Sequence, residues 1–124
     1  MPLEGFVSLC ADERQSTIVS RDKGSQRSHV ANNVNRNLVA HYRIDGDVIH
    51  SNKEQKCDFL LLNEDKATAY LIELKGKSIG EAIKQLENTE KLLANELEPY
   101  HLQFRIICSK AKTHGENPEF CVNP

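Results

Sequence analysis

CDFLLLNEDKATAYLIELKG, residues 57–76, is the stretch that decides the fold. It holds two short apolar runs, Cys57–Leu62 and Ala69–Gly76, both rich in residues typical of β-strands. The polar residues between the runs suit a hairpin loop. Charged side chains within apolar strands are costly unless they pair or bind a metal, so Asp58, Glu73 and Lys75 need an explanation.

An antiparallel hairpin with a four-residue loop, Glu64 to Ala67, would gather these charges. In that register the numbers of facing residues sum to 131, and Asp58 lies directly opposite Glu73. Facing Cβ atoms lie about 4.5–5.5 Å apart. Because strand side chains alternate between faces, Lys75 shares the face of Glu73. A slip by one residue would scatter the three side chains.

Two facing carboxylates repel each other, and a divalent cation removes that cost. Mg²⁺ prefers oxygen ligands and is commonly held by one or two carboxylates together with waters and substrate phosphates, which makes Asp58 and Glu73 candidate ligands. The backbone carbonyl of Leu74 can add another oxygen, and Lys75 can stabilise charge on a phosphate or assist the attacking water. This is the chemistry of phosphodiester hydrolysis. In the structural alternative, Glu73 and Lys75 form an ordinary ion pair and Asp58 merely starts its strand.

The chain resembles the PD-(D/E)xK nuclease superfamily through Cys57-Asp58, with Cys in place of the family's Pro, and through Glu73-Leu74-Lys75. The resemblance covers about residues 28–110. It implies an α/β, restriction-endonuclease-like αβββαβ core, whose mixed central sheet is flanked by helices. It also implies that Asp58 and Glu73 hold Mg²⁺, with Mn²⁺ as a substitute, and that Lys75 assists the water. Several such families carry a glutamine on the second helix, and Gln85 is the candidate here, or else an ordinary boundary residue.

The first helix of that core is expected over Ser28–Tyr42, where Val30, Val34 and Leu38 follow one another at four-residue spacing. Many members carry a further carboxylate on this helix, but the segment has no Asp or Glu. The segment instead offers amides and histidines, namely His29, Asn32, Asn33, Asn35, Asn37 and His41. Three explanations remain open: the third acidic ligand is dispensable, Glu13 or Asp22 replaces it, or the site is degenerate.

The other elements follow from local signals. Asp47–His50 is expected to form the first strand of the core. A helix begins at the capping box of Ser78 and Glu81 and ends before Pro99. Gln103–Cys108 is the last strong strand, and because a helix precedes it, it should lie parallel to the strand of Glu73 through a right-handed crossover. We expect about four strands, with a helix on each side.

Length and composition fit one globular domain of 124 residues, with 39% hydrophobic and 27% charged residues. We divide it into an N-terminal arm or strand and loop (1–27), a nuclease-like core (28–112) and an irregular tail (113–124). No apolar run approaches the roughly 18 residues of a membrane span, and no secretory signal is visible, so a cytoplasmic protein is expected. The four cysteines lack zinc-binding spacing and are expected to be reduced thiols.

Three functions are compatible with these observations. The first is a Mg²⁺-dependent endonuclease acting on duplex or branched DNA, as a homodimer because one small domain offers little surface to grip a duplex. The second is an inactive nuclease-fold module that binds nucleic acid or protein, which the net charge of −2 and the missing helix carboxylate favour. The third is an unrelated α/β domain in which Asp58 and Glu73 are not neighbours.

Overall fold

The computed structural model describes residues 3–21, 27–50, 55–74, 78–107 and 121–122. Its elements are β1 (Thr17–Arg21), β2 (Ser28–Asn32), β3 (Val39–Arg43), β4 (Phe59–Asn63), β5 (Thr68–Glu73), α1 (Ile79–Leu92), α2 (Ala94–Leu97), β6 (His101–Ile107) and β7 (Cys121–Val122). The protein is therefore a mixed α/β fold, as expected. The strands form a two-stranded sheet, β1-β2, and a five-stranded sheet in the order β3-β4-β5-β6-β7.

The five-stranded sheet is mixed. β3, β4 and β5 form an antiparallel meander, and β6 lies parallel to β5 after the α1–α2 crossover. This confirms the predicted parallel pair. The start of α1 is also as predicted, because the Ser78 hydroxyl accepts a hydrogen bond from the Glu81 amide at 3.2 Å. The helical segment is interrupted at Leu93 and continues as the single turn α2.

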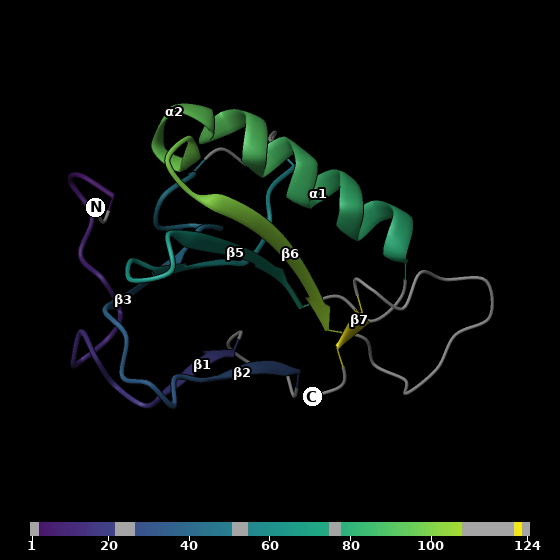
Figure 1. The fold of residues 1–124 in the computed structure, drawn as a ribbon. Helices are drawn as coiled ribbons and strands as arrows, with labels where there is room; N and C mark the ends of the chain where they lie inside the picture. The colour runs from purple at the N-terminus through teal and green to yellow at the C-terminus, as the bar shows by residue number, and fades with distance from the viewer. Residues whose placement is uncertain (1–2, 22–26, 51–54, 75–77, 108–120, 123–124) are drawn as a thin grey trace.

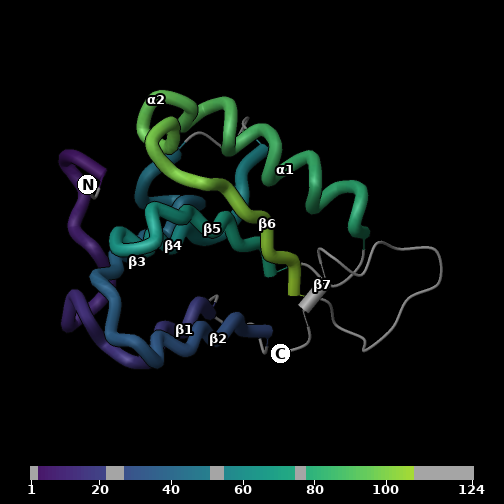
Figure 2. The backbone as a smooth tube through the Cα atoms, in the orientation of Figure 1, coloured from purple at the N-terminus to yellow at the C-terminus, as the bar shows by residue number. Residues whose placement is uncertain are grey.

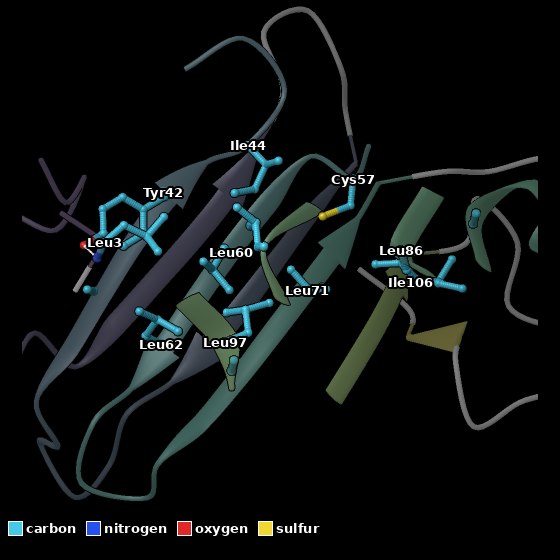
Figure 3. Packing of buried hydrophobic residues seen from close by; sticks show 14 residues of the cluster. Leu3, Tyr42, Ile44, Cys57, Leu60, Leu62, Leu71, Leu86, Leu97 and Ile106 are labelled. Atoms are coloured by element: carbon cyan, nitrogen blue, oxygen red, sulfur yellow. Dashed lines mark hydrogen bonds between the residues drawn. The ribbon is translucent and has the colours of Figure 1, made fainter. Parts of the chain in front are cut away.

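The sheet is covered on both faces, by α1 and α2 on one side and by the β1-β2 hairpin on the other (Figures 1 and 2). Alternate residues of β4 and β5 belong to two separate cores. Leu60, Leu62 and Leu71 pack with α1, as Figure 3 shows, whereas Phe59 and its neighbours pack with Ile18 of β1. Burial on both faces explains why these strands are continuous apolar runs. A helix was expected on each side, and that expectation is wrong for the hairpin side.

The helix predicted over Ser28–Tyr42 does not form, so the αβββαβ order lacks its first helix. The segment instead supplies β2, a loop and β3. Val30 lies opposite Val19 on the outer face of the hairpin and is 50% exposed, and Val34 in the loop is 81% exposed. The four-residue spacing therefore marked no buried stripe.

The strand predicted over Asp47–His50 is also absent. The chain turns back directly after β3, where the Val48 and Ile49 amides bond the carbonyls of Arg43 and Ile44, and only a single bridge joins Asp45 and Ile49. The turn that Asp45-Gly46 predicts therefore extends through this segment, and no strand follows it before His50.

Both chain ends contribute to the folded body. The segment 1–27 supplies β1, and the Leu3 amide donates to the Tyr42 hydroxyl at 3.1 Å (Figure 3). In the segment 113–124, expected to be irregular, Cys121 and Val122 pair in parallel with Ile106 and Ile107 as β7.

Candidate active site

The hairpin of β4 and β5 has the predicted register. Its pairs run from Asn63↔Thr68 to Phe59↔Ile72, so their numbers sum to 131, and residues 64–67 form the turn. Ala67 closes that turn in the left-handed region, with φ of 49°. The register carries Asp58 and Glu73 to the same end of the hairpin, and the predicted register is confirmed.

The ladder ends one pair earlier than expected. The Asp58 amide donates to the Ile72 carbonyl at 3.1 Å, so Asp58 and Phe59 both lie opposite Ile72, as in a β-bulge. The Asp58 side chain accepts a hydrogen bond through Oδ2 from the Leu74 amide at 2.8 Å. Asp58 and Glu73 are therefore not a regular facing pair, because the Asp58 carboxylate takes the next ladder position itself.

Glu73 is the last residue of β5 and is 3% exposed. It alternates with Ala69 and Leu71, which pack against the helix layer, so its side chain lies on the α1 face of the sheet. The pKa of the buried Cys57 thiol is affected by both acids. Its pKa is raised mainly by burial, and also by the nearby negative charges of Glu73 and Asp58. Both carboxylates are thus close to one buried thiol.

Two side chains of α1, those of Thr89 and Asn88, hold the backbone that leads into Asp58. Thr89 accepts the Cys57 amide at 2.8 Å and donates to the Gln85 carbonyl at 2.8 Å. Asn88 donates to the Gln55 carbonyl at 2.6 Å. These contacts fix the start of β4 against the helix. One signal for these contacts is visible in the sequence, where Thr89 takes the place of an apolar residue on the buried side of α1.

Gln85 reaches the same segment, since its Nε2 donates to the Lys56 carbonyl at 3.4 Å. Its Oε1 is buried and accepts no hydrogen bond from the described residues. The structure therefore brings Gln85 to the segment that leads into Asp58. Its part in any chemistry stays a prediction.

The segment that leads into Asp58 also carries a lysine, Lys56. Lys56 is buried, with a side chain 8% exposed, and its ammonium is 3.6 Å from an Asp45 carboxylate oxygen. The position of Lys56, two residues before Asp58, gave no pattern that would have singled it out.

The remaining predicted residues divide into three groups. Lys75 and the candidate ligand Asp22 lie outside the described residues. The Leu74 amide bonds the Asp58 carboxylate, whereas the role of the Leu74 carbonyl as a metal ligand stays a prediction. Glu13 cannot be a third ligand, because its carbonyl accepts the Val39 amide at the far end of β3. Within the described ranges, no three His, Cys, Asp or Glu side chains gather as a metal-binding group.

The polar residues of the segment 28–42 lie away from the carboxylates. The ring of His41 stacks on Phe59 at 5.2 Å, on the hairpin side, and its Nε2 is 2.9 Å from the Ser20 hydroxyl. Asn33 bonds the Gln15 and Asn37 carbonyls, so it holds a loop. Asn33, Asn37 and His41 therefore do not reach the Asp58 end of the sheet.

Comparisons with protein-family models, with curated proteins and with solved structures gave no match. Among the described residues, the helices are too short or too polar to cross a membrane.

Proposed function

We propose that this protein is a metal-dependent nuclease that hydrolyses phosphodiester bonds in DNA. The observation that carries the proposal is the convergence of Asp58 and Glu73 at one end of the β4-β5 hairpin, with the first anchored by the Leu74 amide and the second buried on the α1 face. Burial makes a carboxylate costly to keep ionised, and a bound cation is one arrangement that offsets this cost.

The donor set fits a hard divalent cation. Asp58 and Glu73 supply carboxylate oxygens, and Gln85 adds a buried amide oxygen that bonds no described residue. Mg²⁺ accepts such oxygen ligands, and Mn²⁺ is its usual substitute. When bound, the cation would polarise the phosphate and make water a stronger nucleophile.

The chain's own residues have separate tasks in this proposal. The bond to the Leu74 amide fixes the rotamer of Asp58. Lys75 follows Leu74 directly in sequence, and we assign it the orientation of the attacking water and the neutralisation of charge on the phosphate. The contacts of Thr89 and Asn88 keep the start of β4 in place, which matters because small displacements of catalytic groups reduce rates strongly.

A catalytically inactive module that binds nucleic acid or protein is the second candidate. It is favoured by the absence of a third His, Cys, Asp or Glu ligand within the described ranges, and by two strands and a loop over 28–42, where the resemblance implied a helix. The first candidate includes action on branched or duplex DNA as a homodimer. The support for a homodimer is the small size of the domain, which offers little surface to grip a duplex.

A cleavage assay separates the two candidates. Wild-type protein is incubated with duplex, single-stranded and branched DNA and with RNA, in Mg²⁺ or Mn²⁺. Lys75→Ala should abolish cleavage of DNA, whereas Lys84→Ala, an exposed lysine on α1, should leave it unchanged. Absence of cleavage by the wild type on every substrate would support the inactive module.

A further inference from the structure

A cavity of about 330 Å³ lies on the hairpin side of the sheet, opposite the face of Glu73. Its walls come from β2, the loop before β3, and the sheet residues Leu61, Tyr70 and Arg105. The volume is at the lower end of the range of about 300–1,000 Å³ that is typical of small-molecule sites. It suits a ligand of about the size of one nucleotide.

The lining is polar and positive. None of the described residues that line the cavity is Asp or Glu, although the chain has 18 acidic and 16 basic residues. Lys66 and Arg105 line it, together with the amides of Asn32, Asn35 and Asn63. An acidic protein that keeps carboxylates out of one cavity and places two cations there favours an anionic ligand.

Arg105 is already oriented for such a ligand. Its Cζ atom lies 5.0 Å from the centre of the Tyr70 ring, and its hydrogen bond within the described chain is a 3.4 Å contact to the Phe104 carbonyl. Within the described chain no carboxylate pairs with it. The stacked guanidinium therefore keeps its directional donors for a phosphate, which it binds in a planar, two-pronged geometry.

His29 supplies a second, independent observation. It is 8% exposed, it lines the cavity, and its Nδ1 is buried with no hydrogen-bond partner in the described part of the chain. Burial and the nearby charge of Arg105 lower its pKa to about 4, so its ring is neutral at pH 7. A neutral imidazole with an unmatched nitrogen in a cavity is costly unless a ligand or water bonds it.

We propose that this cavity binds a small organic phosphate of about the size of a nucleoside monophosphate. Arg105 and Lys66 contact the phosphate, the asparagine amides bond the polar groups of the remaining part, and His29 contributes one hydrogen bond. Two cations match a dianionic phosphate better than a singly charged carboxylate. The site lies on the other face of the sheet from the carboxylates, so this proposal does not depend on the nuclease assignment.

The test is calorimetric titration of the full chain with adenosine 5′-monophosphate, with ribose 5-phosphate, adenosine, inorganic phosphate and glucuronate as comparison ligands. The phosphate esters should bind, whereas adenosine and glucuronate should not bind measurably. Arg105→Met should weaken binding of the monophosphate by about tenfold or more, as expected for the loss of a charged hydrogen-bonding pair. Lys66→Ala on the exposed turn should weaken it as well.

Matched controls make the result specific. Arg43 also stacks its guanidinium at 5.0 Å from an aromatic ring, that of Phe59, but does not line the cavity, so Arg43→Met should leave affinity unchanged. Asp58→Asn should also leave it unchanged, which separates this site from the proposed active site. The proposal is overturned if neither phosphate ester binds, if glucuronate binds as well as they do, or if Arg43→Met weakens binding as much as Arg105→Met.

Discussion

The Asp58 carboxylate accepts the Leu74 amide at 2.8 Å, and this one bond joins the two halves of the Asp…Glu-x-Lys pattern. This bond replaces the backbone hydrogen bond that a regular antiparallel pair would make at this position. Glu73 lies between Ile72 and Leu74, both of which bond Asp58. A carboxylate held by a backbone amide is fixed in direction as well as position. The bulge at Asp58 is thus part of how the sheet presents the acid.

Removal of the Asp58 side chain should destabilise the protein. Asp58→Ala leaves the Leu74 amide without its acceptor, and we expect a loss of about 1–3 kcal/mol in the free energy of unfolding. Asp58→Asn keeps an acceptor oxygen and should lose less. Urea unfolding followed by circular dichroism measures both changes, and equal stability of Asp58→Ala and the wild type would contradict the role of this bond.

Thr89 should matter for stability although it lies within a helix. Thr89→Val removes the hydroxyl that accepts the Cys57 amide, which would leave a buried donor unmatched and cost about 1–3 kcal/mol. Thr89→Ser keeps the hydroxyl and serves as the control. Thermal unfolding of the pair measures the difference, and a Thr89→Val protein as stable as Thr89→Ser would show that α1 does not hold the start of β4 through this side chain.

Stability should fall as the pH decreases from 6.5 toward 4. Burial lowers the pKa of His29 and His41 to about 4, with smaller contributions from Arg105 to the first and from His29 and Arg43 to the second. Between pH 4 and 6.5 the unfolded chain therefore binds more protons than the folded one, so protonation favours unfolding, and the loss is at most about 3 kcal/mol per histidine. Above pH 6.5 these two groups add no pH dependence.

Urea titrations at pH 7.5, 5.5 and 4.5 measure that slope. His41→Gln should reduce it, and His101→Gln, which changes an exposed histidine on β6, should not. An unchanged slope in His41→Gln would show that the cost of protonating His41 does not limit stability.

The cap of α1 offers a further test. The Ser78 hydroxyl accepts the Glu81 amide, and Ser78→Ala should cost about 1 kcal/mol. Ser78→Asp keeps a capping oxygen and should retain most of the stability. A fall in melting temperature for Ser78→Ala but not for Ser78→Asp would agree with the capping role, and equal falls would contradict it.

The sequence allowed prediction of those elements that local patterns determine. The β4-β5 register followed from one turn and two apolar runs, and the start of α1 followed from one capping serine. The helix predicted over 28–42 was wrong because Val30 and Val34 have helical spacing but face solvent. Its asparagines are poor helix formers and good turn formers, and Asn33 indeed holds the loop.

The candidate site was predicted in part for the same reason. The convergence of Asp58 and Glu73 follows from hairpin register, which is local. The contacts of Thr89 and Asn88 depend on how α1 packs against the sheet. The bulge at Asp58 and the burial of Lys56 involve Ile72 and Asp45, which lie more than ten residues away in the sequence. Such tertiary contacts leave little trace in the order of residues along the chain.

The most direct test of the central claim is a calorimetric titration of Mn²⁺ into the wild type, Asp58→Asn and Glu73→Gln, with Glu87→Gln on the exposed side of α1 as the control. We expect saturable binding by the wild type and by Glu87→Gln, and none by either of the other variants. Binding that persists unchanged in both Asp58→Asn and Glu73→Gln would contradict the assignment of these two acids as a metal site.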